Sequence, residues 1–233
     1  MRVKRPKGIL FDNDGVLISS EGLHHSAWCE LLHQMKLPFE KIKWEGLVGF
    51  TSVHILEQLL NQFVPGWSKD EYDLEALALK KNDLYLEIAK TDLAPYPGVR
   101  EGLEWLKSQN IPCSVVSNAK RRELVYAMDS LNLGQYFTAI ISRDDASFPK
   151  PHPAMYEMGA LSLGLSPIDC LAIDDSPTGL ESALLAGCQA ASITTNYPKN
   201  HLITPIPGRP DHKTVWVGES TSQFFEWLKN LEI

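Results

Sequence analysis

Two pairs of acidic residues, each placed directly after a short apolar run, are the groups in this sequence with the clearest chemical potential. Asp12 and Asp14 follow the run at 8–11, and Asp174–Asp175 follow the run at 170–173. Short continuous apolar runs predict strands that are buried on both faces of a parallel sheet. Because ligands bind at the carboxyl ends of such strands, we expect the four carboxylates to converge at one edge of the sheet.

Four carboxylates at one edge repel one another unless a cation neutralises them. Two like charges 4 Å apart cost about 4 kcal/mol at an effective dielectric constant near 20. A divalent cation removes this cost, and an all-oxygen site suits Mg²⁺ better than zinc. Each pair also has an ordinary structural interpretation, as an Asx-rich turn or as a helix N-cap. The convergence of both pairs favours a magnesium site.

Two further segments carry groups that suit a phosphoryl anion. Ser117 and Asn118 follow the apolar run at 114–116, and a hydroxyl with free backbone N–H groups at a helix start binds anions. Lys150 stands between Pro149 and Pro151, which stiffen the backbone on both sides of it. A rigidly held lysine beside carboxylates is what a phosphoryl-transfer site requires. Taken separately, these features are also typical of an N-cap serine and a surface lysine.

Composition narrows the class of protein. The chain has 233 residues and a net charge of −7, which makes nucleic acid a poor partner. No apolar run reaches the roughly 18 residues that span a membrane, and none near the N-terminus suits a signal peptide. The four scattered cysteines suggest reduced thiols and a cytoplasmic protein. We therefore expect a soluble globular enzyme with no membrane and no nucleic-acid partner.

Strand-like runs alternate with helical periods over most of the chain, which predicts a doubly wound parallel α/β sheet. The strand-like runs lie at 8–11, 114–116, 139–141, 170–173, 191–193 and 215–217. The stretch from 21 to 90 breaks this alternation because its apolar periods are helical throughout, with Lys81 as an interruption in the third helix. An all-helical block inserted after the first strand predicts a cap, and residues 91–98 suit a proline-rich hinge.

The order of these motifs resembles the haloacid dehalogenase-like hydrolase superfamily. The motifs are Asp12-x-Asp14-Gly15-Val16-Leu17, Ser117-Asn118, Lys150-Pro151 and Asp174-Asp175-Ser176-x-x-Gly179. The resemblance covers nearly the whole chain and is greatest to phosphatases and β-phosphoglucomutase-type enzymes. It implies a Rossmann-like α/β core at 1–19 and 96–233, an all-helical cap at 20–95, and Mg²⁺ as cofactor.

The resemblance also implies a role for each motif residue. Asp12 matches the nucleophile that forms an aspartyl-phosphate, and Asp14 matches the general acid/base, whose backbone carbonyl also binds the metal. Asp175 is expected to bind Mg²⁺ directly, and Asp174 directly or through water. Ser117, the Asn118 N–H and Lys150 are expected to hold the phosphoryl oxygens.

Asp14 and the cap lysines bear on the type of reaction. Dehalogenases of this superfamily lack an acid/base aspartate like Asp14, so its presence favours phosphate esters over haloacids. A phosphonatase is expected to offer a Schiff-base lysine from the cap. The candidate cap lysines lie in polar surroundings and are expected to be solvated; they are Lys41, Lys43, Lys69, Lys80 and Lys81.

A phosphomutase is the alternative enzyme class. His24 and Lys120 match a mutase histidine that governs when Asp14 engages and a lysine near the distal phosphate, although both also suit ordinary helix positions. Where the mutase offers a lysine and an arginine around a cap glycine, this chain has Val48 and Ser52. The missing arginine favours a substrate with one phosphate, because a guanidinium fork is the usual grip on a second phosphate.

The predicted activity is Mg²⁺-dependent hydrolysis of a small phosphorylated metabolite such as a sugar phosphate. Phe50, Thr51 and Ser52 are the candidate cap residues for substrate contact, although Phe50 also suits the core of the cap. Asp144 and Asp145 are expected to be loop acids, one of which caps a helix. A non-catalytic, aspartate-phosphorylated binding module is the alternative of another class, but it needs about half this length.

Overall fold

The computed structural model of the chain describes residues 5–44, 47, 50–204, 206–209 and 211–231. It divides into two compact units, Met1–Ser19 with Ala94–Ile233, and Ser20–Leu93. The first unit is built on a six-stranded sheet in the order β5-β4-β1-β6-β7-β8, in which every neighbouring pair of strands is parallel. Its strands are β1 (Gly8–Phe11), β4 (Cys113–Val116), β5 (Ala139–Ile141), β6 (Cys170–Ile173), β7 (Gln189–Ile193) and β8 (Trp216–Gly218).

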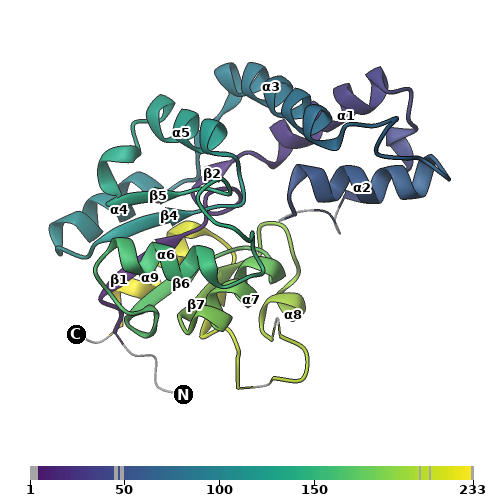
Figure 1. Cartoon of the computed structure of the whole chain (residues 1–233). Helices are drawn as coiled ribbons and strands as arrows, with labels where there is room; N and C mark the ends of the chain where they lie inside the picture. The colour runs from purple at the N-terminus through teal and green to yellow at the C-terminus, as the bar shows by residue number, and fades with distance from the viewer. Residues whose placement is uncertain (1–4, 45–46, 48–49, 205, 210, 232–233) are drawn as a thin grey trace. The chain divides into compact units, whose positions relative to one another are not determined.

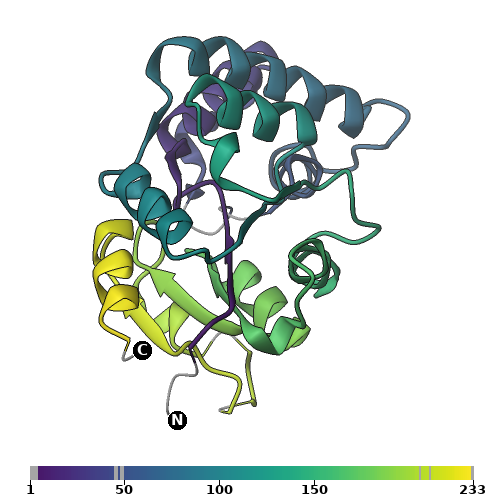
Figure 2. The same ribbon diagram turned by 90° about the vertical axis from the view of Figure 1, so that its left-hand side faces the viewer.

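Helices cover both faces of this sheet, as Figure 2 shows for the first unit. One layer contains α6 and α7, which pack on each other, and the other contains α4 and α9, which also pack on each other. The helices of the unit are α4 (Val99–Ser108), α5 (Arg121–Ser130), α6 (Ala154–Ser162), α7 (Pro177–Ala186), α8 (Lys199–Leu202) and α9 (Thr221–Lys229). This is the predicted doubly wound α/β fold.

The central strand β1 places the acidic residues. It pairs with β4 on one side and β6 on the other, with Phe11 opposite both Val115 and Ile173. All four residues of β1 and of β6 are buried, which explains their uninterrupted apolar sequence. Since Asp12 follows Phe11 and Asp174 follows Ile173, the register puts the two acidic motifs side by side.

A short antiparallel pair of strands joins the two linkers of the first unit, which are the outgoing segment (residues 14–19) and the returning segment (residues 94–98). The sequence did not predict this pair. It consists of β2 (Ile18–Ser19) and β3 (Ala94–Pro95). The Tyr96 N–H also donates to the Leu17 carbonyl, 3.0 Å away. The segments by which the chain leaves and re-enters the first unit are therefore tied to each other within that unit.

The second unit is helical, as predicted. Its helices are α1 (Glu21–Gln34), α2 (Ser52–Phe63) and α3 (Leu74–Asp92), all visible in Figure 1. Thr51 and Asp73 cap the last two by accepting hydrogen bonds from the N–H groups of His54 and Ala76. The core of the unit is made by Trp28, Leu31, Leu32, Leu47, Ile55, Leu56, Leu59, Leu60, Leu74 and Ala78.

The structure departs from the sequence expectations in a few details. β7 begins two residues earlier than the predicted run, and β8 lies one residue later. The loop expected between Asn196 and Thr214 contains the short helix α8. Lys81 does not interrupt the third cap helix but lies within α3 and is buried. No helix among the described residues combines the length and apolarity that a membrane span needs.

Candidate active site

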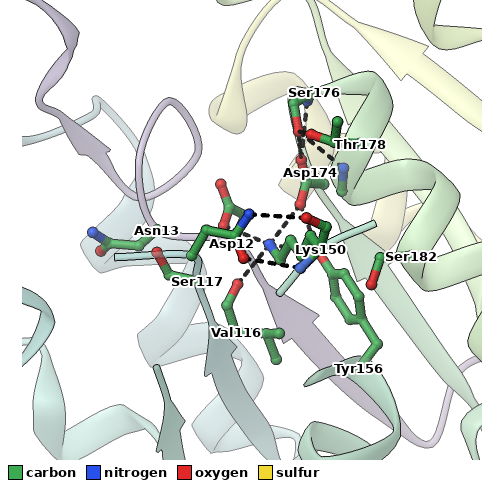
Figure 3. A network of polar contacts seen from close by, with 12 residues as sticks. Asp12, Asn13, Val116, Ser117, Lys150, Tyr156, Asp174, Ser176, Thr178 and Ser182 are labelled. Carbon is green, nitrogen blue, oxygen red and sulfur yellow. Dashed lines mark hydrogen bonds and ion pairs between the residues drawn. The ribbon is translucent and has the colours of Figure 1, made fainter. Parts of the chain in front are cut away.

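Lys150 lies at the centre of a buried polar network (Figure 3). Its Nζ is 2.7 Å from Asp12 Oδ1, 2.8 Å from Asp174 Oδ2 and 2.8 Å from the Val116 carbonyl oxygen. The lysine is only 5% exposed. These three contacts, with a longer one of 3.3 Å to the Tyr156 hydroxyl, fix the orientation of its charge.

Asn118 holds the main chain of Lys150 in place. The Lys150 N–H donates to Asn118 Oδ1 at 3.0 Å, and Asn118 Nδ2 donates to the Lys150 carbonyl at 3.4 Å. Pro149 and Pro151, which were predicted to stiffen this segment, restrict the backbone torsions on either side of Lys150. The lysine is thus positioned through its backbone by a residue of the Ser117-Asn118 motif, a contact the sequence did not reveal.

Asp174 is held on both of its carboxylate oxygens. Oδ2 accepts from Lys150 and from the Tyr156 hydroxyl at 2.7 Å, while Oδ1 accepts from the Ser176 N–H at 3.0 Å and the Ser176 hydroxyl at 2.7 Å. Gly179 is required nearby, because a Cβ at that position would lie 1.8 Å from Asp174 Oδ2. This close approach gives a physical reason for a glycine after the Asp-Asp-Ser motif.

Burial and the charge of Lys150 act in opposite directions on the pKa values of Asp12 and Asp174. Burial raises the pKa of Asp12 well above its ordinary value, and the nearby Asp174 charge adds to this, although Lys150 opposes it. Burial also favours neutral Asp174, but the Lys150 charge and the hydrogen bonds from Lys150, Ser176 and Tyr156 outweigh it and lower the pKa of Asp174. Asp174 is therefore the anionic partner of Lys150, whereas burial favours the protonated form of Asp12.

The donor set suits a hard divalent cation. One carboxylate oxygen each from Asp12, Asp174 and Asp175 lies within 4.8 Å of the others, and all three residues are buried. Asn196 Nδ2 donates to Asp175 Oδ2 and fixes that side chain. The Lys150 ammonium contacts two of these carboxylates, those of Asp12 and Asp174. Carboxylate oxygens are ligands that Mg²⁺ prefers, so this cluster suits that cation.

Asp14 lies beside the cluster rather than in it. Its Oδ2 accepts from Asn13 Nδ2 at 3.2 Å and from the Ser117 hydroxyl at 3.5 Å. The Ser117 hydroxyl also accepts from the Ala119 N–H at 3.0 Å. Asp14 is partly exposed, in contrast to buried Asp12. The two aspartates of the first motif thus occupy different environments, which is the condition for giving two carboxylates different roles.

The candidate substrate-contact residues of the second unit make contacts with other residues of that unit. Phe50 stacks on His54 with ring centroids 4.7 Å apart and packs on the core of that unit, while the Ser52 hydroxyl donates to Asn82 at 3.4 Å. Thr51 caps α2. Their predicted contact with substrate remains a prediction. Val48, used in the mutase argument, lies outside the described residues.

His24 and Lys81 form a second polar centre within the helical unit. Lys81 Nζ lies 2.6 Å from His24 Nδ1, and the His24 ring stacks on Tyr85 with centroids 4.0 Å apart. Lys81 is 3% exposed, so the expectation that it is solvated was wrong. The reason is packing: its ammonium lies over the rings of Trp28 and Tyr85, at 5.5 and 5.3 Å from their centroids.

Lys120 and the two loop acids lie at the start of α5. Lys120 Nζ is 3.3 Å from Asp144 Oδ1, and Asp144 accepts a hydrogen bond of 2.9 Å from the Arg121 N–H. Asp145 pairs with the Arg121 guanidinium at 2.5 Å. The prediction that one of these acids caps a helix is confirmed, and Lys120 is engaged with that capping acid.

The structure brings the predicted core residues together in one unit. Residues that the sequence did not single out complete their shell: Asn13, Tyr156 and Asn196. Tyr156 falls in an ordinary helical pattern, and Asn196 in a proline-rich loop. No local signal marks either residue, because each reaches the site only through the packing of its element on the sheet.

The parallel sheet, the acid pairs at the ends of β1 and β6, and the buried lysine together define a class of hydrolase. The family model for haloacid dehalogenase-like hydrolases matches residues 9–193. The chain therefore belongs to the haloacid dehalogenase-like hydrolase family and is an enzyme of its phosphatase type. This confirms the family inferred from the motifs.

Two relatives and one solved structure show which kinds of protein the chain is similar to. It is 30% identical to phosphoglycolate phosphatase 1 of Pseudomonas aeruginosa, over 88% of this chain and 72% of that protein. It is 28% identical to the β-phosphoglucomutase of Bacillus subtilis, over 82% of this chain and 85% of that protein. The fold matches that of a hydrolase from Pseudomonas syringae with a TM-score of 0.80, at 21% identity and coverage of 97% and 99%.

Proposed function

We propose that this protein hydrolyses the phosphate monoester of a small metabolite through an aspartyl-phosphate on Asp12, with Mg²⁺ as cofactor. The observation that carries the proposal is the pairing of Asp12 with Lys150 inside a buried carboxylate cluster. The family supports a hydrolase of the phosphatase type. In this proposal residues 1–19 and 94–233 are the catalytic core, and residues 20–93 are the cap that selects the leaving group.

Asp12 and Asp14 divide the chemistry between them. An Asp12 carboxylate oxygen forms a bond to phosphorus as the bond from phosphorus to the substrate oxygen breaks, and Asp14 gives its proton to that leaving oxygen. Asp14 then takes a proton from water. The water oxygen bonds to phosphorus, the bond to Asp12 breaks, and inorganic phosphate leaves. The partly exposed position of Asp14 beside buried Asp12 suits a group that exchanges protons with water.

Three groups hold the phosphoryl oxygens in this proposal: the Ser117 hydroxyl, the Asn118 N–H and the Lys150 ammonium. Ser117 and Asn118 follow β4, Lys150 lies in the segment before α6, and these groups stand in place before the reaction begins. Donors that are fixed in advance stabilise charge on the transferring group without reorganisation, which is the main catalytic contribution in phosphoryl transfer. The contacts of Lys150 with Val116 and Asn118 provide that fixation.

Asp12, the Asp14 backbone carbonyl and Asp175 are the proposed direct ligands of Mg²⁺, and Asp174 acts through water. Each Asp174 oxygen already accepts two hydrogen bonds, which fills the usual capacity of a carboxylate oxygen. When bound, the cation supplies positive charge to the phosphoryl oxygens and offsets the buried negative charge of the cluster.

The experiment is a phosphate-release assay on a panel of phosphorylated metabolites with and without Mg²⁺. The panel includes phosphoglycolate and several sugar phosphates, because relatives act on both kinds of substrate. Release that needs Mg²⁺ and is abolished by Asp12→Asn supports the proposal. Release that persists in Asp12→Asn contradicts it, because the amide is not a nucleophile for phosphorus.

A phosphomutase of the β-phosphoglucomutase type is the second candidate. It is favoured by the B. subtilis relative and by the two positions that match mutase residues, His24 and Lys120. Against it, Lys120 is paired with Asp144. Glucose 1-phosphate and glucose 6-phosphate in the same assay decide between the two activities. Their interconversion without net phosphate release identifies a mutase, whereas a long-lived phospho-aspartate without turnover identifies a binding module.

A further inference from the structure

Three side-chain hydroxyls from the C-terminal part of the first unit hold the main chain of the two linkers. The Thr221 hydroxyl donates to the Val16 carbonyl at 2.6 Å, and the Ser222 hydroxyl donates to the Pro97 carbonyl at 2.7 Å. The Thr195 hydroxyl donates to the Gly15 carbonyl at 2.8 Å. Adjacent residues at the start of α9 thus hold the outgoing and the returning linker at once.

The loop that carries Asp14 is closed by hydrogen bonds within residues 13–18. The Asn13 carbonyl accepts from the N–H groups of Leu17 and Ile18, and the Gly15 N–H donates to the Ile18 carbonyl. The carbonyls of Gly15 and Val16 are met from outside, by Thr195 and Thr221. Val16 is fully buried and Thr221 is 2% exposed, so water does not readily replace the threonine hydroxyl.

Helix α9 is itself fixed against β1, the strand that precedes Asp12. The Phe11 ring lies 6.1 Å from the ring of Phe224 and 5.9 Å from that of Phe225, measured between centroids. On the returning linker, Gly98 has a φ of +83°, and a Cβ there would lie 2.4 Å from the Ser222 hydroxyl oxygen. Phe11 therefore supports α9, and Gly98 allows the returning linker to approach Ser222 closely.

We propose that Thr221 is a positioning residue for Asp14, assisted by Thr195 and Ser222, which fix the linkers. The inference rests on the proposed function, in which Asp14 transfers the proton. Val16, whose carbonyl Thr221 holds, is two residues from Asp14 in the same closed loop. A shift of this loop displaces the acid/base from the leaving oxygen while the phosphoryl-holding groups Ser117 and Lys150 stay in place. The expected consequence is slower chemistry with little change in substrate binding.

The test compares Thr221→Val with Thr214→Val. Both substitutions replace a buried threonine hydroxyl that donates to a buried carbonyl, and the Thr214 partner is Leu202, far along the chain from the linkers. With a substrate that the wild type hydrolyses, Thr221→Val is expected to lower kcat about tenfold or more and to leave KM within about twofold. Thr214→Val is expected to lose a similar amount of thermal stability and to keep kcat.

Hydrogen exchange provides a readout that does not depend on activity. In Thr221→Val, the amides of residues 14–19 and of Ala94, Tyr96 and Gly98 are expected to exchange at least about fivefold faster than in Thr214→Val. The inference is overturned if Thr221→Val keeps a wild-type kcat, or if its linkers exchange no faster than those of Thr214→Val. If the wild type hydrolyses no phosphate ester, the proposed function fails, while exchange still decides whether Thr221 holds the linkers.

Discussion

Each of the two units contains a buried lysine, and the two lysines differ in what surrounds them. Lys150 in the α/β unit contacts two carboxylates and a backbone carbonyl. Lys81 in the helical unit contacts an imidazole nitrogen and lies over two aromatic rings. The first environment is anionic and holds the charge by ion pairing. The second contains an imidazole and two aromatic rings.

This difference separates two ways of burying an ammonium group. Lys150 neutralises acids that would otherwise repel one another, so the acids and the lysine depend on one another. Lys81 lies along apolar rings with its nitrogen on His24, so its aliphatic stem contributes packing as well. The comparison teaches that burial alone does not identify a phosphoryl-binding lysine. Lys150 is identified by the two carboxylates that its ammonium contacts.

The largest expected effect is that of Lys150→Met. Removal of the ammonium leaves Asp12 and Asp174 buried without their cation, so we expect the free energy of unfolding to fall by about 3–5 kcal/mol. Phosphate release is expected to fall at least about a hundredfold. The control is Lys120→Met, whose ion pair with Asp144 is partly exposed and contributes about 1 kcal/mol or less. Equal stability of the two variants in urea unfolding would contradict the importance given to the buried pair.

Lys81→Met is expected to have a smaller effect. The methionine keeps most of the packing over Trp28 and Tyr85 but loses the bond to His24, which costs about 1.5–3 kcal/mol for a charged donor. Lys80→Met is the matched control one residue away on the same helix, since Lys80 is exposed. Urea unfolding measures both variants. A loss for Lys81→Met as large as that of Lys150→Met would remove the distinction between the two environments.

Tyr156→Phe tests how far Asp174 depends on the Tyr156 hydroxyl. It removes the hydroxyl that donates to Asp174 but keeps the ring, whose centroid lies 4.8 Å from Lys150 Nζ. The expected loss is about 1–2 kcal/mol of stability and a few-fold of activity, since Lys150 and Ser176 still hold Asp174. Tyr136→Phe, whose hydroxyl donates to Glu104 at the surface, is the control. No difference between the two variants would show that Asp174 does not depend on Tyr156.

The smallest effects concern thiol reactivity, which also differs between the units. Cys29 in the helical unit is partly exposed, whereas Cys113 and Cys170 of the α/β unit are buried. Burial raises the pKa of Cys113 to about 12 and that of Cys170 to about 11. At pH 8 only about one Cys113 thiol in ten thousand is ionised, so iodoacetamide is expected to label Cys29 first.

The pH dependence of labelling has a definite sign. The folded-state pKa of Cys113 lies above its ordinary value of 9.0, so the protonated thiol contributes stability that is present below pH 9 and is lost as pH rises towards 12. Labelling of folded Cys113 and Cys170 is expected to rise about tenfold per pH unit above pH 8, as the ionised fraction does. Mass spectrometry follows each site. Fast labelling of either core thiol at pH 8 would contradict this account.

Much of the α/β unit was readable from the sequence because its signals are local. Strands β1, β5 and β6 were predicted at their observed bounds, since a strand buried on both faces needs an uninterrupted apolar run. The motif residues Asp12, Ser117 and Asp174 follow such runs directly. Parallel pairing then brings the ends of the runs to one edge without further information.

The environments of individual side chains were decided only by tertiary packing. Lys81 looks like an interruption in a helical period, and its burial follows from rings that α1 and α3 supply together. Asn196 and Thr221 reach their partners, Asp175 and Val16, across 21 and 205 positions of the chain.

By itself, the sequence determined the family, the sheet and the acids at its edge, because each is encoded within a few consecutive residues. Only the tertiary structure decided which hydroxyls and amides hold those acids and the linkers beside them. A hydrogen bond depends on where two distant elements pack, and no local pattern records that position.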